Sequence, residues 1–217
     1  MYNAAIFDFD GVILDSFQDQ YKWFRHISSV LEKKFPYKNI DEFKEDYREP
    51  VYPDMYRFLG FDWDSEKNII WKEYNQHKAN AKIELFDDIQ DTIKELNKRG
   101  INLAIASSNT HDAIYKHLRN NNLDIYFQAV VCKEDLPVEN CEPLLKPNPA
   151  CIMLALNKLQ NPTNAIYIGD QPSDIIATKR AGIASAAVTY GYSSKEKLLE
   201  HSPDYVVDNP KQILELF

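Results

Sequence analysis

Four aspartates stand after two short apolar runs, in two pairs with close spacing. Asp8 and Asp10 come after one apolar run, and Asp170 and Asp174 come after another. In an extended chain, residues two apart project to the same side, about 6.6 Å from each other. Clustered carboxylates suit a hard cation such as Mg²⁺, which also allows them to stay ionised together. The sequence therefore predicts a magnesium site at Asp8, Asp10, Asp170 and Asp174.

Hydrogen-bond donors and one cation complete this set of residues. Ser107, Ser108 and Asn109 follow the apolar run 101–106, and Lys146 precedes a Pro-x-Pro turn. The Lys146 ammonium and the Ser107 hydroxyl provide charge and a donor for a bound oxyanion, with Ser108 as a competing choice for that donor. Backbone N–H groups beside Gly11 add further donors. These residues predict a phosphate-binding site.

Carboxylates, a cation and an anion site together favour phosphoryl transfer, in which catalysis is mainly positioning and charge neutralisation. A carboxylate nucleophile can form an aspartyl-phosphate. Asp10, as a second acid, can protonate the leaving oxygen and then activate water. The expected substrate is a small phosphorylated metabolite.

Alternating apolar runs and helical patterns indicate the elements that carry these residues. Buried strands are expected at 4–7, 101–106, 129–132, 165–168, 184–188 and 205–207. Helices are expected at 110–120, from Pro149, at 173–181 and from Pro210. Strands that alternate with helices indicate a Rossmann-like parallel sheet with helices on both faces, an α/β fold. Ligands bind beyond the carboxyl ends of such strands, where the polar residues stand.

Residues 15–85 differ from the rest of the chain. They hold 15 of the 27 aromatic residues and lack short apolar runs bounded by turns. We therefore expect an inserted α-helical domain at 15–85, within an α/β catalytic core formed by 1–14 and 86–217.

Composition limits the partners that we expect. The chain has 217 residues, 25 basic and 33 acidic, and a formal net charge of −8. An acidic surface repels phosphate backbones, so nucleic acid is not expected as a partner. No apolar stretch approaches the roughly 20 residues that span a membrane. With no visible signal peptide, we expect a cytoplasmic protein.

Cysteine and histidine patterns do not indicate a further metal site. The odd number of cysteines and their spacings at Cys132, Cys141 and Cys151 match no zinc pattern. The five histidines show no ligand spacing, and His111 is expected on a helix surface.

Four segments resemble the motifs of the haloacid dehalogenase-like superfamily, in the same order. They are IFDFDGV at 6–12, AIASSN at 104–109, KPNP at 146–149 and IGDQPSD at 168–174. The resemblance covers essentially the whole chain and is specific because all four motifs occur together. It extends to the phosphoglycolate phosphatase-like and β-phosphoglucomutase-like members, which carry a small helical cap.

The resemblance implies roles for the site residues. Asp8 would be the nucleophile and a metal ligand. Asp10 would be the general acid/base, with its backbone carbonyl on Mg²⁺. Asp170 would ligate the metal and Asp174 would support it, while Ser107 and Lys146 would hold the phosphoryl group. The insert 15–85 would be the cap.

Two alternatives remain beside a Mg²⁺-dependent phosphatase. Dehalogenases lack an acid at the position of Asp10, so phosphate chemistry is favoured over carbon–halogen cleavage. Sugar-phosphate mutases of the superfamily resemble the chain around Asp10 but usually carry a histidine where this chain has Gln20. A catalytically silent member that only binds a phosphorylated ligand is the second alternative.

Overall fold

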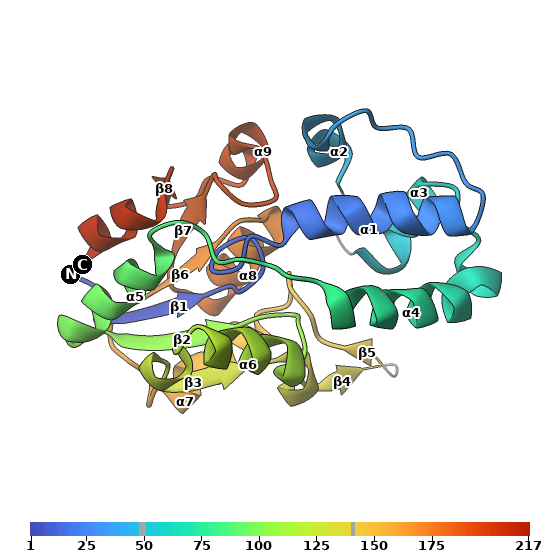
Figure 1. The fold of residues 1–217 in the computed structure, drawn as a ribbon. Helices are drawn as coiled ribbons and strands as arrows, with labels where there is room; N and C mark the ends of the chain where they lie inside the picture. Colours follow the sequence, from blue (N-terminus) through green and yellow to red (C-terminus); the bar gives the residue numbers. More distant parts are fainter. Residues whose placement is uncertain (48–50, 140–141) are drawn as a thin grey trace. The chain divides into compact units, whose positions relative to one another are not determined.

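The computed structural model describes residues 1–47, 51–139 and 142–217. The chain forms two compact units (Figure 1). One unit comprises Met1–Asp15 and Leu85–Phe217, and the other comprises Ser16–Glu84.

The larger unit is built on a six-stranded sheet in the order β3-β2-β1-β6-β7-β8, with every adjacent pair parallel. The strands are β1 (Ala4–Phe7), β2 (Asn102–Ala106), β3 (Ala129–Val131), β6 (Ala165–Gly169), β7 (Ala184–Val188) and β8 (Tyr205–Val207). All four residues of β1 are fully buried, as expected for a strand covered on both faces. The predicted parallel α/β fold is confirmed.

Helices connect the strands and cover both faces of the sheet. They are α5 (Ile89–Lys98), α6 (His111–Asn120), α7 (Ala150–Lys158), α8 (Pro172–Ala181) and α9 (Lys195–Glu200). Parallel crossovers are right-handed, so helices change face where the direction of strand addition reverses. That reversal lies between β3 and β6. Residues of α7 and α8 accordingly share a core cluster with Ala4 and Ile6 of β1, while α6 lies on the other side of the sheet (Figure 1).

Shorter elements complete this unit. Turns of 3₁₀ helix lie at Asp124–Tyr126, Lys133–Asp135 and Pro210–Leu216, and β4 (Val138–Glu139) pairs antiparallel with β5 (Glu142–Pro143). The helix expected from Pro210 is present at Pro210–Leu216, as a 3₁₀ helix. The hairpin and α9 were not predicted.

The strand order places the ends of β1 and β6 side by side. Phe7 pairs with Ile168, and the Asp8 N–H donates to the carbonyl of Ile168 at 2.9 Å. The chain leaves β1 in one direction and β6 in the other, which makes this the switch point where open α/β sheets bind ligands. The residues after these two strands therefore meet at one edge.

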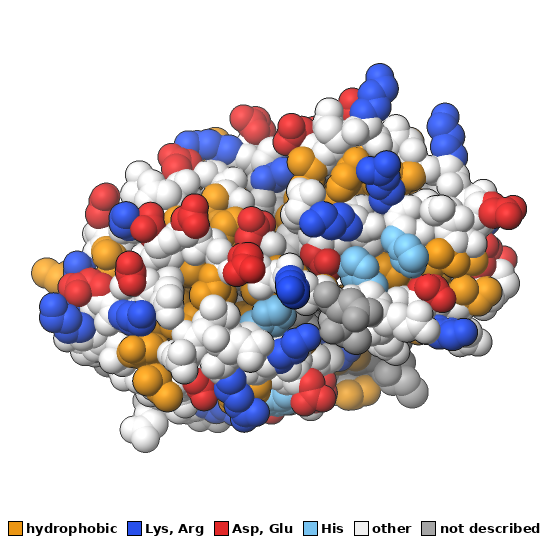
Figure 2. All heavy atoms as spheres, viewed as in Figure 1, with side chains coloured by type: hydrophobic (Ala, Val, Ile, Leu, Met, Phe, Trp, Pro, Cys, Tyr) orange, Lys and Arg blue, Asp and Glu red, His pale blue; other side chains and the backbone are white. Residues whose placement is uncertain are grey.

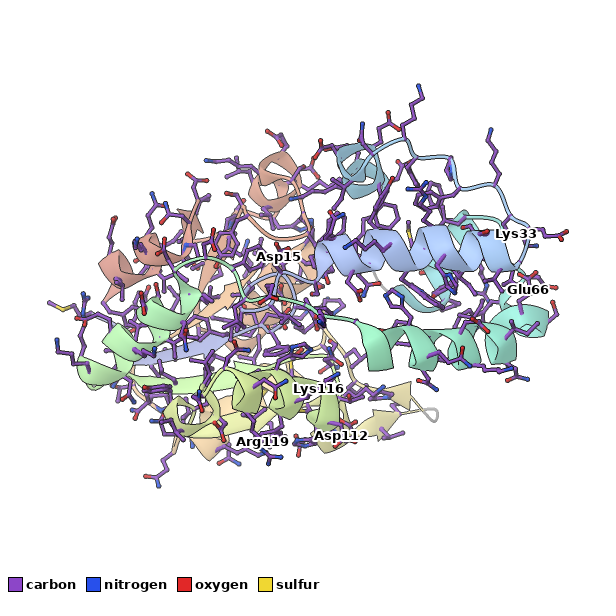
Figure 3. The ribbon with its side chains drawn as sticks, viewed as in Figure 1. Asp15, Lys33, Glu66, Asp112, Lys116 and Arg119 are labelled. Atoms are coloured by element: carbon purple, nitrogen blue, oxygen red, sulfur yellow. The ribbon has the colours of Figure 1, made fainter. Side chains whose placement is uncertain are left out.

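The smaller unit is helical, with α1 (Phe17–Val30), α2 (Ile40–Asp46), a π-helical turn (Val51–Met55), α3 (Tyr56–Phe58) and α4 (Trp63–Asn80). Its aromatic residues form its core. Trp23, Phe24, Phe43 and Tyr56 are fully buried, and Trp23 Nε1 donates to the Tyr56 hydroxyl at 2.7 Å. On its surface, Lys33 and Glu66 form an ion pair at 3.0 Å (Figure 3).

The surface mixes both signs of charge. Figure 2 shows acidic and basic side chains interspersed across the viewed face. None of the helices within the described residues is both long enough and apolar enough to cross a membrane.

We predict that Trp23→Phe destabilises the chain because it removes the buried hydrogen bond to Tyr56 and part of the indole packing. The expected loss is about 1–3 kcal/mol in the free energy of unfolding. Urea unfolding followed by circular dichroism measures it. Trp71, which is 38% exposed, provides the matched control, and Trp71→Phe should change the value by less than about 0.5 kcal/mol. Equal losses would contradict the aromatic core.

Candidate active site

The ammonium group of Lys146 lies between two buried carboxylates. Its Nζ donates to Asp8 Oδ2 at 2.6 Å and to Asp174 Oδ1 at 2.6 Å. The side chains of Lys146, Asp8 and Asp174 are only 5%, 8% and 2% exposed. Charge-assisted hydrogen bonds of this length are strong, and buried charges require such partners.

Asp8 and Asp174 are held at the ends of secondary-structure elements. Asp8 directly follows β1, and its Oδ1 accepts from the N–H of Phe9 at 2.7 Å. Asp174 lies in the first turn of α8, where its Oδ2 accepts from the N–H groups of Asp170 and Gln171, both at 3.0 Å. Asp174 thereby forms a capping box with Gln171 and stabilises the loop after β6.

Tyr167 orients the lysine from within the sheet. Its hydroxyl accepts from Lys146 Nζ at 3.0 Å and donates to the carbonyl of Ala106 at 2.9 Å. The hydroxyl therefore connects the end of β2 with the buried ammonium. This fixes the position of Lys146 relative to the two strands.

Asp170 adds a third carboxylate. Carboxylate oxygens of Asp8, Asp170 and Asp174, all buried, lie within 4.8 Å of one another. Asp170 Oδ2 also accepts from the N–H of Tyr192 at 2.6 Å. Three carboxylates and one ammonium leave an excess of negative charge, and an oxygen-only donor set of this kind fits Mg²⁺.

Two glycines make room for Asp170. Gly11 has a φ of +78°, and a Cβ there would overlap the Asp170 carboxylate and lie 2.9 Å from the Tyr192 ring. A Cβ at Gly191 would meet the same carboxylate and the carbonyl of Gly11. Backbone from two loops therefore packs closely around this side chain, which only glycine allows.

Asp10 lies in a separate hydrogen-bonded group. Its Oδ2 accepts from Asn109 Nδ2 at 2.7 Å, and the Asn109 N–H donates to the hydroxyl of Ser107 at 3.2 Å. Ser107 is buried, whereas Ser108 is exposed. Among the described residues, the carboxylate of Asp10 does not join the cluster of Asp8, Asp170 and Asp174. The expected role of Asp10 on the metal, through its backbone carbonyl, stays a prediction.

Burial dominates the electrostatics of the cluster. Burial raises the pKa of Asp8 to about 7, against the lowering effect of Lys146 and with a further increase from Asp174. For Lys146, burial lowers the pKa, but the adjacent carboxylates of Asp174 and Asp8 raise it well above its usual range. The lysine therefore stays charged, and a bound cation would favour ionised Asp8.

Asp8, Lys146, Asp170 and Asp174 were predicted from the sequence as site residues, and the structure brings them together. Tyr167 and Tyr192 were not predicted. Tyr167 belongs to an apolar strand, where a tyrosine fits a core position equally well. Tyr192 follows β7, so the rule that ligands bind beyond the carboxyl ends of strands points to its loop.

A sequence model of the family described as haloacid dehalogenase-like hydrolase matches residues 5–188. The match includes all four motif segments. Pyrophosphatase PpaX from Bacillus pumilus is 25% identical over 213 residues, which cover 98% of this chain and 94% of that protein. Phosphoglycolate phosphatase from Vibrio vulnificus is 29% identical over 148 residues, 68% of this chain and 62% of that protein.

Solved structures share the fold. A hydrolase of the haloacid dehalogenase-like family from Streptococcus pneumoniae has a TM-score of 0.81 at 24% identity. The alignment covers 100% of this chain and 98% of that one.

We predict that Gly11→Ala destabilises the chain more than Gly100→Ala does. The two glycines have φ values of +78° and +76°, so the backbone cost, about 1–2 kcal/mol, is matched. Gly100 has nothing within 4 Å of the added Cβ, whereas Gly11 faces Asp170. Thermal unfolding of both variants measures the difference, and equal losses would show that Gly11 does not make room for Asp170.

Proposed function

Because the chain belongs to the haloacid dehalogenase-like hydrolase family and is a phosphatase, we propose that it hydrolyses a small phosphorylated metabolite with Asp8 as the nucleophile. The observation that carries this proposal is the buried position of Asp8, hydrogen-bonded to Lys146 and within one carboxylate cluster. A carboxylate at the end of the central strand, with an ammonium beside it, fits phosphoryl transfer by way of an aspartyl-phosphate.

Mg²⁺ is the proposed cofactor. Asp8 and Asp170, with support from Asp174 and the backbone carbonyl of Asp10, would hold it. When bound, it would neutralise charge on the carboxylates and on the phosphoryl oxygens. The excess of carboxylates over ammonium groups in the cluster supports this assignment.

The proposed reaction has two displacement steps at phosphorus. In the first, an oxygen of Asp8 forms a bond to phosphorus while the ester P–O bond breaks, and Asp10 gives its proton to the leaving oxygen. In the second, Asp10 takes a proton from water, the water oxygen bonds to phosphorus, and Asp8 is released. Asn109, which donates to Asp10 at 2.7 Å, would hold Asp10 toward the reacting oxygen.

Lys146 and Ser107 are proposed to bind the phosphoryl oxygens, with Ser108 and Asn109 beside them. Lys146 already contacts the attacking carboxylate, so a phosphoryl group on Asp8 would come within reach of its ammonium. Asp174 is mainly a positioning residue, since it accepts from Lys146 and from two N–H groups of the loop after β6. This agrees with the role in support of the metal that the resemblance implies.

The substrate class follows from the relatives. One relative, aligned over 98% of this chain, is named pyrophosphatase, and another is named phosphoglycolate phosphatase. Both names denote small phosphorylated compounds, so inorganic pyrophosphate belongs with phosphomonoesters among the candidates. We propose that the helical unit 16–84 is a cap that sets the choice among them.

We predict Mg²⁺-dependent phosphate release from a panel that contains pyrophosphate, phosphoglycolate, sugar phosphates and nucleoside monophosphates. EDTA should abolish it. Asp8→Asn should lower turnover by about 10⁴-fold or more, as expected for loss of a nucleophile. Asp112→Asn, an exposed carboxylate on α6 (Figure 3), is the matched control and should retain activity.

Three other results of this assay would contradict the proposed phosphatase mechanism. Full activity of Asp8→Asn would overturn the role of Asp8. Conversion of a sugar phosphate into its isomer without phosphate release would show a mutase, and ligand binding without any turnover would show a silent member.

We also predict that Asp10→Asn slows the two displacement steps of the reaction by different factors. With an alkyl phosphate, kcat should fall by about 10²–10⁴-fold because the leaving oxygen needs a proton. With p-nitrophenyl phosphate, which releases a weakly basic phenolate, the first step should be largely spared and should appear as a burst of p-nitrophenol. Stopped-flow absorbance measures the burst, and an equal loss of the first step for both substrates would contradict the acid role.

A further inference from the structure

A second group of potential metal ligands lies outside the carboxylate–lysine cluster. Ligand atoms of His111, Cys132 and Glu134 lie within 4.8 Å of one another. His111 begins α6, Cys132 directly follows β3, and Glu134 lies in the 3₁₀ turn after it. An imidazole, a thiol and a carboxylate thus converge from two segments of the chain.

We infer that His111, Cys132 and Glu134 form a binding site for Zn²⁺ or a similar transition-metal ion. Zn²⁺ binds thiolate, imidazole and carboxylate in tetrahedral geometry, with ligand atoms about 3.5 Å apart. In this structure the three ligand atoms lie within 4.8 Å of one another, so the side chains would draw together around a bound ion. The mixture of soft and hard donors separates this site from the oxygen-only cluster, which suits Mg²⁺.

Asp135 holds the proposed ligands in place. Its Oδ2 lies 3.0 Å from His111 Nε2 and accepts from the backbone N–H of Cys132 at 2.9 Å. The backbone N–H of His111 also donates to Glu134 Oε2 at 3.2 Å. A carboxylate behind a ligating histidine is the usual outer arrangement of zinc sites, because it orients the ring and increases its basicity.

The proposed ligands differ in exposure. Cys132 is fully buried, whereas Glu134 is exposed, so an ion would reach the thiol from the side of Glu134.

The site is joined to the loop that carries Asn109. The N–H of Lys133 donates to the carbonyl of Asn109 at 3.1 Å, and His111 is two residues further along the chain. An ion bound here would tie the start of α6 to the turn at Lys133–Asp135. Sequence spacing could not indicate this because His111 and Cys132 are 21 positions apart and meet only through the pairing of β2 with β3.

The optical absorption spectrum of bound Co²⁺ tests this site without an activity assay. The purified chain, saturated with Mg²⁺ to occupy oxygen ligands, is titrated with Co²⁺ and then with Zn²⁺. We expect a thiolate-to-cobalt charge-transfer band at one ion per chain, which Zn²⁺ abolishes. Cys132→Ser should remove the band. Glu134→Gln, on an exposed side chain that does not endanger folding, should weaken Co²⁺ binding by about tenfold or more.

Matched controls test whether other thiols or another imidazole contribute to the band. Cys151→Ser, Cys141→Ser and His201→Gln should retain the band and its affinity. Absence of a charge-transfer band, or a band that persists in Cys132→Ser and is lost in a control, would overturn the proposal. Unchanged Co²⁺ affinity in Glu134→Gln would also contradict it.

Discussion

The ammonium of Lys146 lies between the buried carboxylates of Asp8 and Asp174, and the surrounding loops are organised around this contact. Burial of charges is costly, so each must have a partner. Removal of one partner from a buried pair typically costs about 3–5 kcal/mol. Tyr167 and the loop after β6 satisfy the remaining hydrogen bonds of the group. The charges proposed to act in catalysis are thus also a constraint on folding.

The strand order of the sheet brings these carboxylates together. Asp8 and Asp170 are far apart in the chain, yet each directly follows one of two adjacent central strands. Gly11 and Gly191 allow the backbone to pack against Asp170, so that its carboxylate stays close to that of Asp8. An excess of negative charge remains in the cluster. The proposed Mg²⁺ would remove that excess, and the phosphoryl group would then meet Asp8 beside a cation and an ammonium.

Local pattern was sufficient to predict most of the larger unit, because its strands are short apolar runs bounded by turns. The polar residues that follow these strands include Asp8 and the aspartates after β6, whereas Lys146 was identified by its place before a Pro-x-Pro turn. Contacts between distant segments could not be predicted in this way. Tyr167 has the same pattern as a core residue, and its hydroxyl meets Lys146 only after β6 enters the sheet. The grouping of His111 with Cys132 likewise depends on the order of the strands.

The proposed mechanism passes the phosphoryl group through Asp8. Mass spectrometry of the chain, quenched in acid during turnover and digested, tests this step. We expect one added phosphoryl group on the peptide that contains Asp8, lost when hydroxylamine cleaves the acyl phosphate. A phosphoryl group on another residue would rule out this role of Asp8. So would rapid-quench samples that contain no phosphorylated peptide while phosphate is released, since that result would indicate direct attack by water.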